Sequence, residues 1–255
     1  MSAFTLTFGN RAENHIGNEK LGGDEAIEGL TLSELERVKE QLGSRAEIID
    51  LTKLLSEDER KQVEPAYLLV VRGGVGALIG EENKLLEELK ERDADSKYWD
   101  TRRSKVLNKI ARHNYCISDF ERTEPDYEHG RGHVYDFKNM EWANKLRGQI
   151  GRVFGPKCER LQGEINLYYD VNKCGIGWHG DAEREIVVGA RFGASFPLAF
   201  RWFCQGEVKG EKLVLELNDG DVYAMSAKAV GKDWKKRKIY TLRHAAGCNK
   251  YVNAK

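Results

Sequence analysis

The sequence predicts an α+β fold in which an α/β region, residues 1–155, precedes a β domain, residues 156–255. Before the Gly155-Pro156 pair, apolar residues recur at helical spacing in several segments. After it, short stretches alternate between apolar and polar residues and are separated by turns. Several short strands at such spacing are typical of a β-sandwich or a jelly roll. We therefore expect the N-terminal region to support a β core and to shape a cleft beside it.

The N-terminal region contains the predicted helices. Residues 1–30 have little apolar periodicity, so we expect an irregular arm there, without a chemical role. Thr31 and Glu34 form a capping-box pattern, because the Thr hydroxyl can accept from the N3 amide while the Glu carboxylate reaches back. The predicted elements are helices at residues 31–42, 56–63, 81–92 and 139–154, a buried strand at 67–71, a turn at 72–80 and a loop at 121–132.

The β domain is expected to begin after Gly155-Pro156, where the apolar period changes from helical spacing to alternation. Its predicted strands cover residues 164–169, 186–194, 199–204, 212–217, 221–225 and 238–244. We expect these strands to build the sandwich or jelly roll.

The composition says more about where in the cell the protein is expected than about what it does. The start of the chain lacks the basic and long apolar regions of a signal peptide, and no stretch approaches the roughly 18–20 apolar residues that span a bilayer. The five cysteines are scattered and include no C-x-x-C pair, which argues against a disulfide framework or a zinc ribbon. We expect an intracellular protein, cytoplasmic or nuclear, that has no membrane partner.

Formal net charge is zero, yet two segments are basic. Residues 97–113 mix Tyr98 and Trp99 with several Lys and Arg residues, a combination that can stack on bases and pair with phosphates. Residues 228–255 carry nine Lys or Arg residues against Asp233 alone. Each segment is a candidate nucleic-acid contact. The alternative for residues 97–113 is a surface helix, and the alternative for residues 228–255 is a solvated basic hairpin.

His179-Gly180-Asp181 is the most informative motif of the chain. On a strand, residues i and i+2 share a face, so one imidazole and one carboxylate can point at the same position. A neutral imidazole beside a carboxylate suits a divalent first-row metal, and non-haem iron oxygenases use a face of two His and one carboxylate. A His-x-Asp pair is common in proteins, so it indicates a metal site only when further motifs of such a site accompany it.

Those motifs occur in a recognisable order. Asn166-x-Tyr168 precedes His179-x-Asp181, and Arg237 and Arg243 follow, six residues apart. In this order the part from Asn166 to Arg243 resembles the AlkB family of iron(II) and 2-oxoglutarate dioxygenases. The resemblance implies a double-stranded β-helix, with Fe(II) and 2-oxoglutarate as cofactors.

The resemblance also implies roles for single residues. His179 and Asp181 would hold the iron as catalytic ligands, and Arg237 would pair with the distal carboxylate of 2-oxoglutarate, since a guanidinium forms two parallel bonds to a carboxylate. Asn166 and Tyr168 would add neutral hydrogen bonds to that cosubstrate.

Three further residues receive roles near the metal. Arg243 is expected to contact the 1-carboxylate of 2-oxoglutarate or to orient Asp181, and so to take part in catalysis. Glu183 stands where family members place a carboxylate near the target base. Trp178 is a candidate substrate contact, or equally a core residue.

The third metal ligand departs from the family pattern. The distal His of the family would fall near Trp234-Lys235, where this chain has none. His244 is the only downstream histidine, but it follows Arg243 directly, and on a regular strand the two side chains point to opposite faces. A bulge could turn His244 inward. Otherwise a Lys, Asp233 or water completes the coordination sphere, or the protein has lost redox activity.

The resemblance, supported by Glu183 and the two basic segments, implies an oxidoreductase that hydroxylates or demethylates a nucleobase in DNA or RNA, so that nucleic acid is the expected partner. Two alternatives remain open: a hydroxylase of a protein side chain or small molecule, which the zero net charge also suits, and a catalytically inactive binding module of the same fold. Salt-dependent binding to oligonucleotides distinguishes the first reading from the second.

Overall fold

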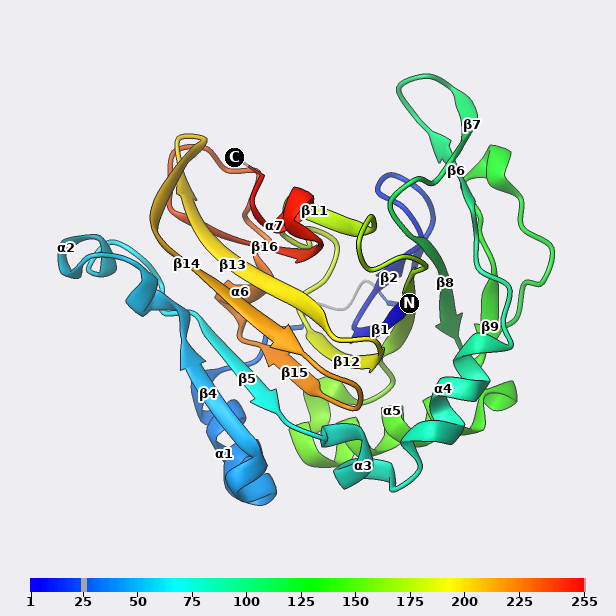
Figure 1. Cartoon of the computed structure of the whole chain (residues 1–255), viewed down its shortest axis with the longest axis horizontal. Helices are drawn as coiled ribbons and strands as arrows, with labels where there is room; N and C mark the ends of the chain where they lie inside the picture. The colour runs from blue at the N-terminus through cyan, green and yellow to red at the C-terminus, as the bar shows by residue number, and fades with distance from the viewer. Residues whose placement is uncertain (24–26, 255) are drawn as a thin grey trace.

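The computed structural model describes residues 1–23 and 27–254 as a mixed α+β structure built around two large β-sheets (Figure 1). The larger sheet has eight strands, in the spatial order β4 (Ala46–Asp50), β5 (Tyr67–Val71), β15 (Val222–Met225), β12 (Val187–Gly193), β1 (Ala3–Gly9), β10 (Gln162–Tyr168), β8 (His113–Ser118) and β9 (Val134–Asp136). The smaller sheet has four, in the order β11 (Gly175–His179), β16 (Thr241–Gly247), β13 (Phe196–Cys204) and β14 (Glu207–Leu217).

Helices and two small hairpins complete the described part of the chain. The α-helices are α1 (Leu32–Leu42), α2 (Glu57–Arg60), α3 (Gly74–Ile79), α4 (Glu82–Lys90), α5 (Glu141–Phe154), α6 (Ala227–Val230) and α7 (Asn249–Val252), and short 3-10 helices occur at Gly43–Arg45, Leu51–Leu54, Tyr127–His129, Phe137–Asn139 and Pro156–Cys158. The hairpins pair β2 (Ala12–Glu13) with β3 (Lys20–Leu21) and β6 (Lys97–Asp100) with β7 (Lys105–Asn108). The β6–β7 hairpin projects from the body of the molecule (Figure 1).

Strand β1 corrects the expectation of an irregular N-terminal arm. It pairs antiparallel with β10 on one side and with β12 on the other. Its sequence alternates, so Phe4, Leu6 and Phe8 enter the core beside the helices, whereas Thr5 and Thr7 point to the opposite face. The large sheet therefore contains strands from both sides of residue 155, and the expected division into two regions does not separate the sheets.

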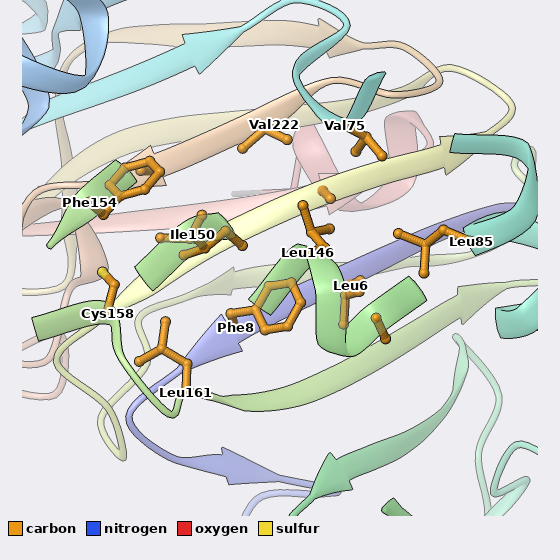
Figure 2. Packing of buried hydrophobic residues seen from close by; sticks show 14 of the residues in the cluster. Leu6, Phe8, Val75, Leu85, Leu146, Ile150, Phe154, Cys158, Leu161 and Val222 are labelled. Atoms are coloured by element: carbon orange, nitrogen blue, oxygen red, sulfur yellow. The ribbon is translucent and has the colours of Figure 1, made fainter. Parts of the chain in front are cut away.

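The main apolar core lies between the large sheet and the helices α1, α3, α4 and α5. Leu146, Ile150 and Phe154 of α5 pack near Leu6 and Phe8 of β1 (Figure 2). The three α5 side chains recur every four residues, which places them on one helical face. A second core joins the other face of the large sheet to the small sheet.

Several local predictions are confirmed. Thr31 caps α1 through the expected capping box, with the Glu34 amide donating to the Thr31 hydroxyl at 3.3 Å and the Thr31 amide donating to the Glu34 carboxylate at 2.8 Å. The strand at 67–71 and the first five predicted strands of the β domain are present, with ends shifted by a few residues.

Three local predictions are wrong. Residues 97–108 form a hairpin, where a surface helix was one expectation, and residues 74–79 form a short helix where a turn was expected. The last strand begins at Thr241, three residues later than predicted, because its partner β13 ends at Cys204. After Cys204 the chain turns, and the Gln205 amide donates to the Arg237 carbonyl at 2.8 Å.

Candidate metal centre

His179, Asp181 and His244 converge at one end of the space between the two sheets. His179 ends β11 and lies opposite His244 of β16, so the two side chains share a face, and the register shifts between Ile176 and His179. Asp181 Oδ1 lies 3.7 Å from His179 Nε2 and 3.6 Å from His244 Nε2. All three ligand atoms lie within 4.8 Å of one another, a spacing that suits a shared metal ion.

Hydrogen bonding sets the tautomer of His179. Its Nδ1 lies 2.7 Å from the Gly177 carbonyl, to which it donates, so that Nε2 keeps its lone pair toward Asp181. Burial, reinforced by the neighbouring His244, lowers the pKa of His179 to about 3. The imidazole is therefore neutral at physiological pH, the state that binds a metal. His244 Nδ1 is buried and has no hydrogen-bond partner among the described residues.

Arg184 holds the far side of the Asp181 carboxylate. Its Nε lies 3.8 Å from Asp181 Oδ2, while its Nη2 pairs with Glu164 at 2.5 Å and with Glu183 at 2.9 Å. Burial alone would raise the pKa of Asp181, but the charge of Arg184 and the nearby His244 outweigh it and hold that pKa well below its usual range. Asp181 is thus an oriented carboxylate, with Oδ1 toward the histidines. This orienting role, expected of Arg243, falls to Arg184.

Gly180 allows the metal-binding turn to approach the end of α6. The Asp181 amide donates to the Val230 carbonyl at 3.0 Å, and a Cβ at Gly180 would overlap the Gly231 carbonyl. Gly180 therefore permits a contact that any larger residue prevents.

We expect Gly180→Ala to destabilise the protein by about 1–3 kcal/mol, because overpacking forces the backbone to shift, and to weaken metal binding as well. Gly177→Ala is the matched control, because a Cβ at Gly177 meets nothing within 4 Å. Thermal unfolding and Mn(II) titration of both variants measure the effect. Equal stability and metal affinity in the two variants would contradict it.

A cavity of about 290 Å³ adjoins His179, Asp181 and His244. One wall is a row across the large sheet, in which Thr5 of β1 lies opposite Arg191 of β12 on one side and Asn166 of β10 on the other. Tyr168, two residues after Asn166, lines the same wall. This volume is close to the lower end of the range for small-molecule sites.

Asn166 and Tyr168 therefore lie where the sequence predicts, in one cavity with His179 and Asp181. Asn166 Oδ1 accepts from Arg112 Nε at 2.5 Å, and its Nδ2 donates to Glu164 at 3.0 Å. The Tyr168 ring is buried and packs against Phe196, with ring centroids 4.4 Å apart.

The predictions for Arg237 and Arg243 are wrong. Arg237 is exposed in the turn before β16 and does not line the cavity. Arg243 lies on β16, but its side chain takes the face opposite to His244 and lies over the Phe203 ring, 4.2 Å from the centroid. Adjacent residues of a strand point to opposite faces, so Arg243 is excluded from the cavity because His244 faces it. No bulge at His244 is needed.

Two further candidates have different outcomes. Trp178 packs against Ala199, Ala245 and Val252 on the outer face of the small sheet, and its Nε1 donates to the Ala254 carbonyl at 2.9 Å, so it is not a cavity residue. Glu183 does line the cavity, and burial, with Asp181 close by, raises its pKa. Asp233, an alternative ligand, pairs with Lys228 at 2.7 Å instead.

Sequence reasoning missed the residues at the cavity mouth that come from the N-terminal segment. Glu13 and His15 line the cavity, and the His15 ring lies against Tyr98 of the β6–β7 hairpin, with centroids 3.7 Å apart. Burial lowers the pKa of His15 to about 4. Trp234, from the turn before β16, closes the other side. The only sequence signal was the alternation in β1, which implies that the residues just after it stay near the sheet.

Glu13 makes stability depend on pH. It is 8% exposed and accepts from the Gly17 amide at 2.8 Å, and burial, with Glu183 nearby, raises its pKa from 4.5 to about 7. The folded state thus binds this proton more tightly than the unfolded chain. The resulting stabilisation is complete below pH 4.5 and is lost as the pH rises through about 7.

We expect Glu13→Gln to stabilise the protein above neutral pH, by up to about 3 kcal/mol, and to have little effect in mild acid. Denaturant unfolding across this pH range measures the difference between variant and wild type. A difference that does not grow with pH would exclude Glu13 as the titrating group.

Fold and site together define a mixed α+β protein whose two sheets enclose a cavity, with a His-Asp-His group able to hold a metal ion at its wall. The chain is 40% identical over 251 residues to "Uncharacterized protein R156" of Acanthamoeba polyphaga mimivirus, an alignment that covers 97% of this chain and 96% of the viral protein. It belongs to the same family as that viral protein. No protein-family model matches the chain. Within residues 1–23 and 27–254, no helix combines the length and apolar character needed to cross a bilayer.

Proposed function

We propose that this protein is an Fe(II)- and 2-oxoglutarate-dependent dioxygenase of the AlkB-like type. The observation that carries the proposal is the convergence of His179, Asp181 and His244 on one point at the wall of a cavity. Two imidazoles and one carboxylate are the donor set of non-haem iron oxygenases, which leaves further metal positions open for ligands. The neutral His179, the ionised Asp181 and the His244 Nε2 that faces Asp181 Oδ1 fit such an ion.

The arrangement of strands supports a double-stranded β-helix. From β10 to β13 the chain alternates between the large and the small sheet, and it alternates again from β14 through β15 to β16. Four strands of the large sheet, in the order β15-β12-β1-β10, face the four of the small sheet across a shared core. In this reading β1, from the other end of the chain, supplies the eighth strand.

The proposed reaction consumes oxygen and 2-oxoglutarate and inserts one oxygen atom into a C–H bond of the substrate. The other oxygen atom enters succinate, and the 1-carboxylate of 2-oxoglutarate leaves as carbon dioxide. Bound iron would supply the oxidation, while the chain holds and orients the reactants and keeps water away. Arg184 fixes Asp181, the Gly177 carbonyl fixes His179, and the buried cavity wall limits access of water.

For the substrate we propose a nucleobase in DNA or RNA. Trp234 and His15 place rings at the cavity mouth, and Glu13 and Glu183 add carboxyl groups that can contact the polar edge of a base. Exposed basic residues stand on the adjoining hairpin, at Lys97, Arg102, Arg103 and Lys105. Lys235 also lines the outer part of the mouth. Such residues can hold a phosphate backbone while a base enters.

The direct test measures succinate formed from 2-oxoglutarate by protein supplied with Fe(II), ascorbate and oxygen, with methylated oligonucleotides present or absent. We expect turnover in the wild type and none above background in His179→Ala and Asp181→Ala. His129→Ala, an exposed histidine, is the matched control and should retain full turnover. If oligonucleotides never stimulate turnover but a protein or small molecule does, the hydroxylase alternative replaces the nucleobase.

A further inference from the structure

Arg191 is a buried cation without a carboxylate partner. Its side chain is 1% exposed, and among the described residues no ion pair satisfies it. Its Nη1 donates to Thr5 Oγ1 at 2.6 Å, and its Nε has no hydrogen-bond partner among the residues that the structure describes. Asp221, whose carbonyl accepts from the Arg191 amide, has its carboxylate already bonded to Arg72 at 2.5 Å and to the Gly73 amide at 3.0 Å. A buried charge without a counterion is unfavourable, and a bound anion would remove that cost.

The guanidinium group faces the cavity beside the His-Asp-His group. Arg191 alternates along β12 with Val188 and Ala190, which enter the helix-side core, so it takes the opposite face. Two aromatic rings flank it, with Cζ 5.1 Å from the Phe196 centroid and 5.9 Å from the Tyr168 centroid. These rings hold the guanidinium group in a fixed, dry position.

We propose that Arg191, with the Thr5 hydroxyl beside it, binds the distal carboxylate of the 2-oxo acid whose other end reaches the metal. This inference rests on the proposed function and names the anchor that Arg237 does not provide. The N-terminal strand β1 is then part of the cosubstrate site as well as of the sheet. A guanidinium group can form two parallel charge-assisted bonds to a carboxylate, and in a buried site these bonds are strong.

The other cations of the cavity are already engaged. Arg184 pairs with Glu164 and Glu183 and orients Asp181. Arg112 donates its Nε to Asn166 at 2.5 Å and is more exposed than Arg191. Arg191 is thus the cavity cation that combines deep burial with an unsatisfied donor.

The test compares two ligands on the full-length protein loaded with Mn(II), which prevents turnover. One is 2-oxoglutarate, and the other is 2-oxopentanoate, which has a methyl group in place of the distal carboxylate. Isothermal titration calorimetry gives each Kd for the wild type, Arg191→Met, Arg191→Lys and the control Arg237→Met. Mn(II) affinity and circular dichroism report whether each variant is folded.

We expect Arg191→Met to weaken 2-oxoglutarate binding by about 100-fold or more and to change 2-oxopentanoate binding by less than about 3-fold. Arg191→Lys should restore part of the affinity, and Arg237→Met should bind like the wild type. If Arg191→Met does not fold, Thr5→Val provides the same comparison, with an expected loss of about 3- to 10-fold for 2-oxoglutarate alone.

Unchanged 2-oxoglutarate affinity in Arg191→Met, or an equal loss for both ligands, would overturn the assignment of Arg191 and leave the dioxygenase proposal intact. A wild type that binds Mn(II) but neither ligand would overturn the proposed function, and the anchor with it. The two failures are therefore distinguishable.

Discussion

Replacing His244 with alanine is expected to lower the affinity for Mn(II) or Fe(II) by at least about 100-fold. Changes to groups that only orient a metal ligand typically cost about 10- to 100-fold in affinity, so loss of a ligand atom should reach or exceed that range. His244 Nε2 lies 3.6 Å from Asp181 Oδ1, and its ring centroid lies 4.4 Å from that of His179, so its removal takes away one side of the site.

Arg243→Met is the matched control, because Arg243 precedes His244 on the same strand and points to the other face. Calorimetric titration with Mn(II), with unfolding measured in parallel, separates a lost ligand from a lost fold. The assignment of His244 fails if both variants keep the affinity of the wild type, or if both lose it equally while they remain folded.

Leu6→Asp is expected to prevent folding. Leu6 is fully buried in the core beneath the helices, on a strand that pairs along both edges within the large sheet. An unpaired carboxylate there costs several kcal/mol, a large part of the roughly 5–15 kcal/mol that stabilises a typical domain.

Ile110→Asp is the control for that prediction, because Ile110 is 83% exposed. Soluble yield and circular dichroism report folding, and Leu6→Ala, expected to cost about 2–5 kcal/mol, gives a measurable intermediate. A Leu6→Asp variant as stable as Ile110→Asp would mean that β1 is dispensable.

Local rules predicted much of the fold. The capping box predicted the start of α1. His179 and Asp181 do lie beside each other, but β11 ends at His179, so the turn at Gly180 and not a shared strand face brings Asp181 there. The alternation of side chains along a strand showed that Arg243 and His244 cannot both face the cavity, and the structure places His244 inward. The resemblance assigned an inward role to Arg243, and this pairwise constraint explains why that role is wrong.

The features that the sequence did not predict depend on pairing between strands that are far apart in the chain. Residues 3–9 alternate between apolar and polar side chains, a pattern that the expectation of an irregular arm overlooked. Nothing local, however, indicates that this strand inserts between β10 and β12, more than 150 residues away in sequence. The start of β16 is set by where β13 ends, and not by its own residues, so Arg237 was assigned to a strand that does not reach it. Arg191 lies beside Thr5 through the same long-range pairing of β1 with β12, which no local pattern of residues indicates.

The most direct test of the metal centre is an anaerobic titration of the Fe(II)-loaded protein with 2-oxoglutarate, followed by visible absorption. It requires metal and cosubstrate at one site but no knowledge of the substrate. We predict a charge-transfer absorption that saturates at one equivalent per chain and is absent from His179→Ala and His244→Ala. A wild type that gives no such absorption while binding both Fe(II) and 2-oxoglutarate, or a band that persists in the two variants, would contradict a cosubstrate-binding iron centre built from His179, Asp181 and His244.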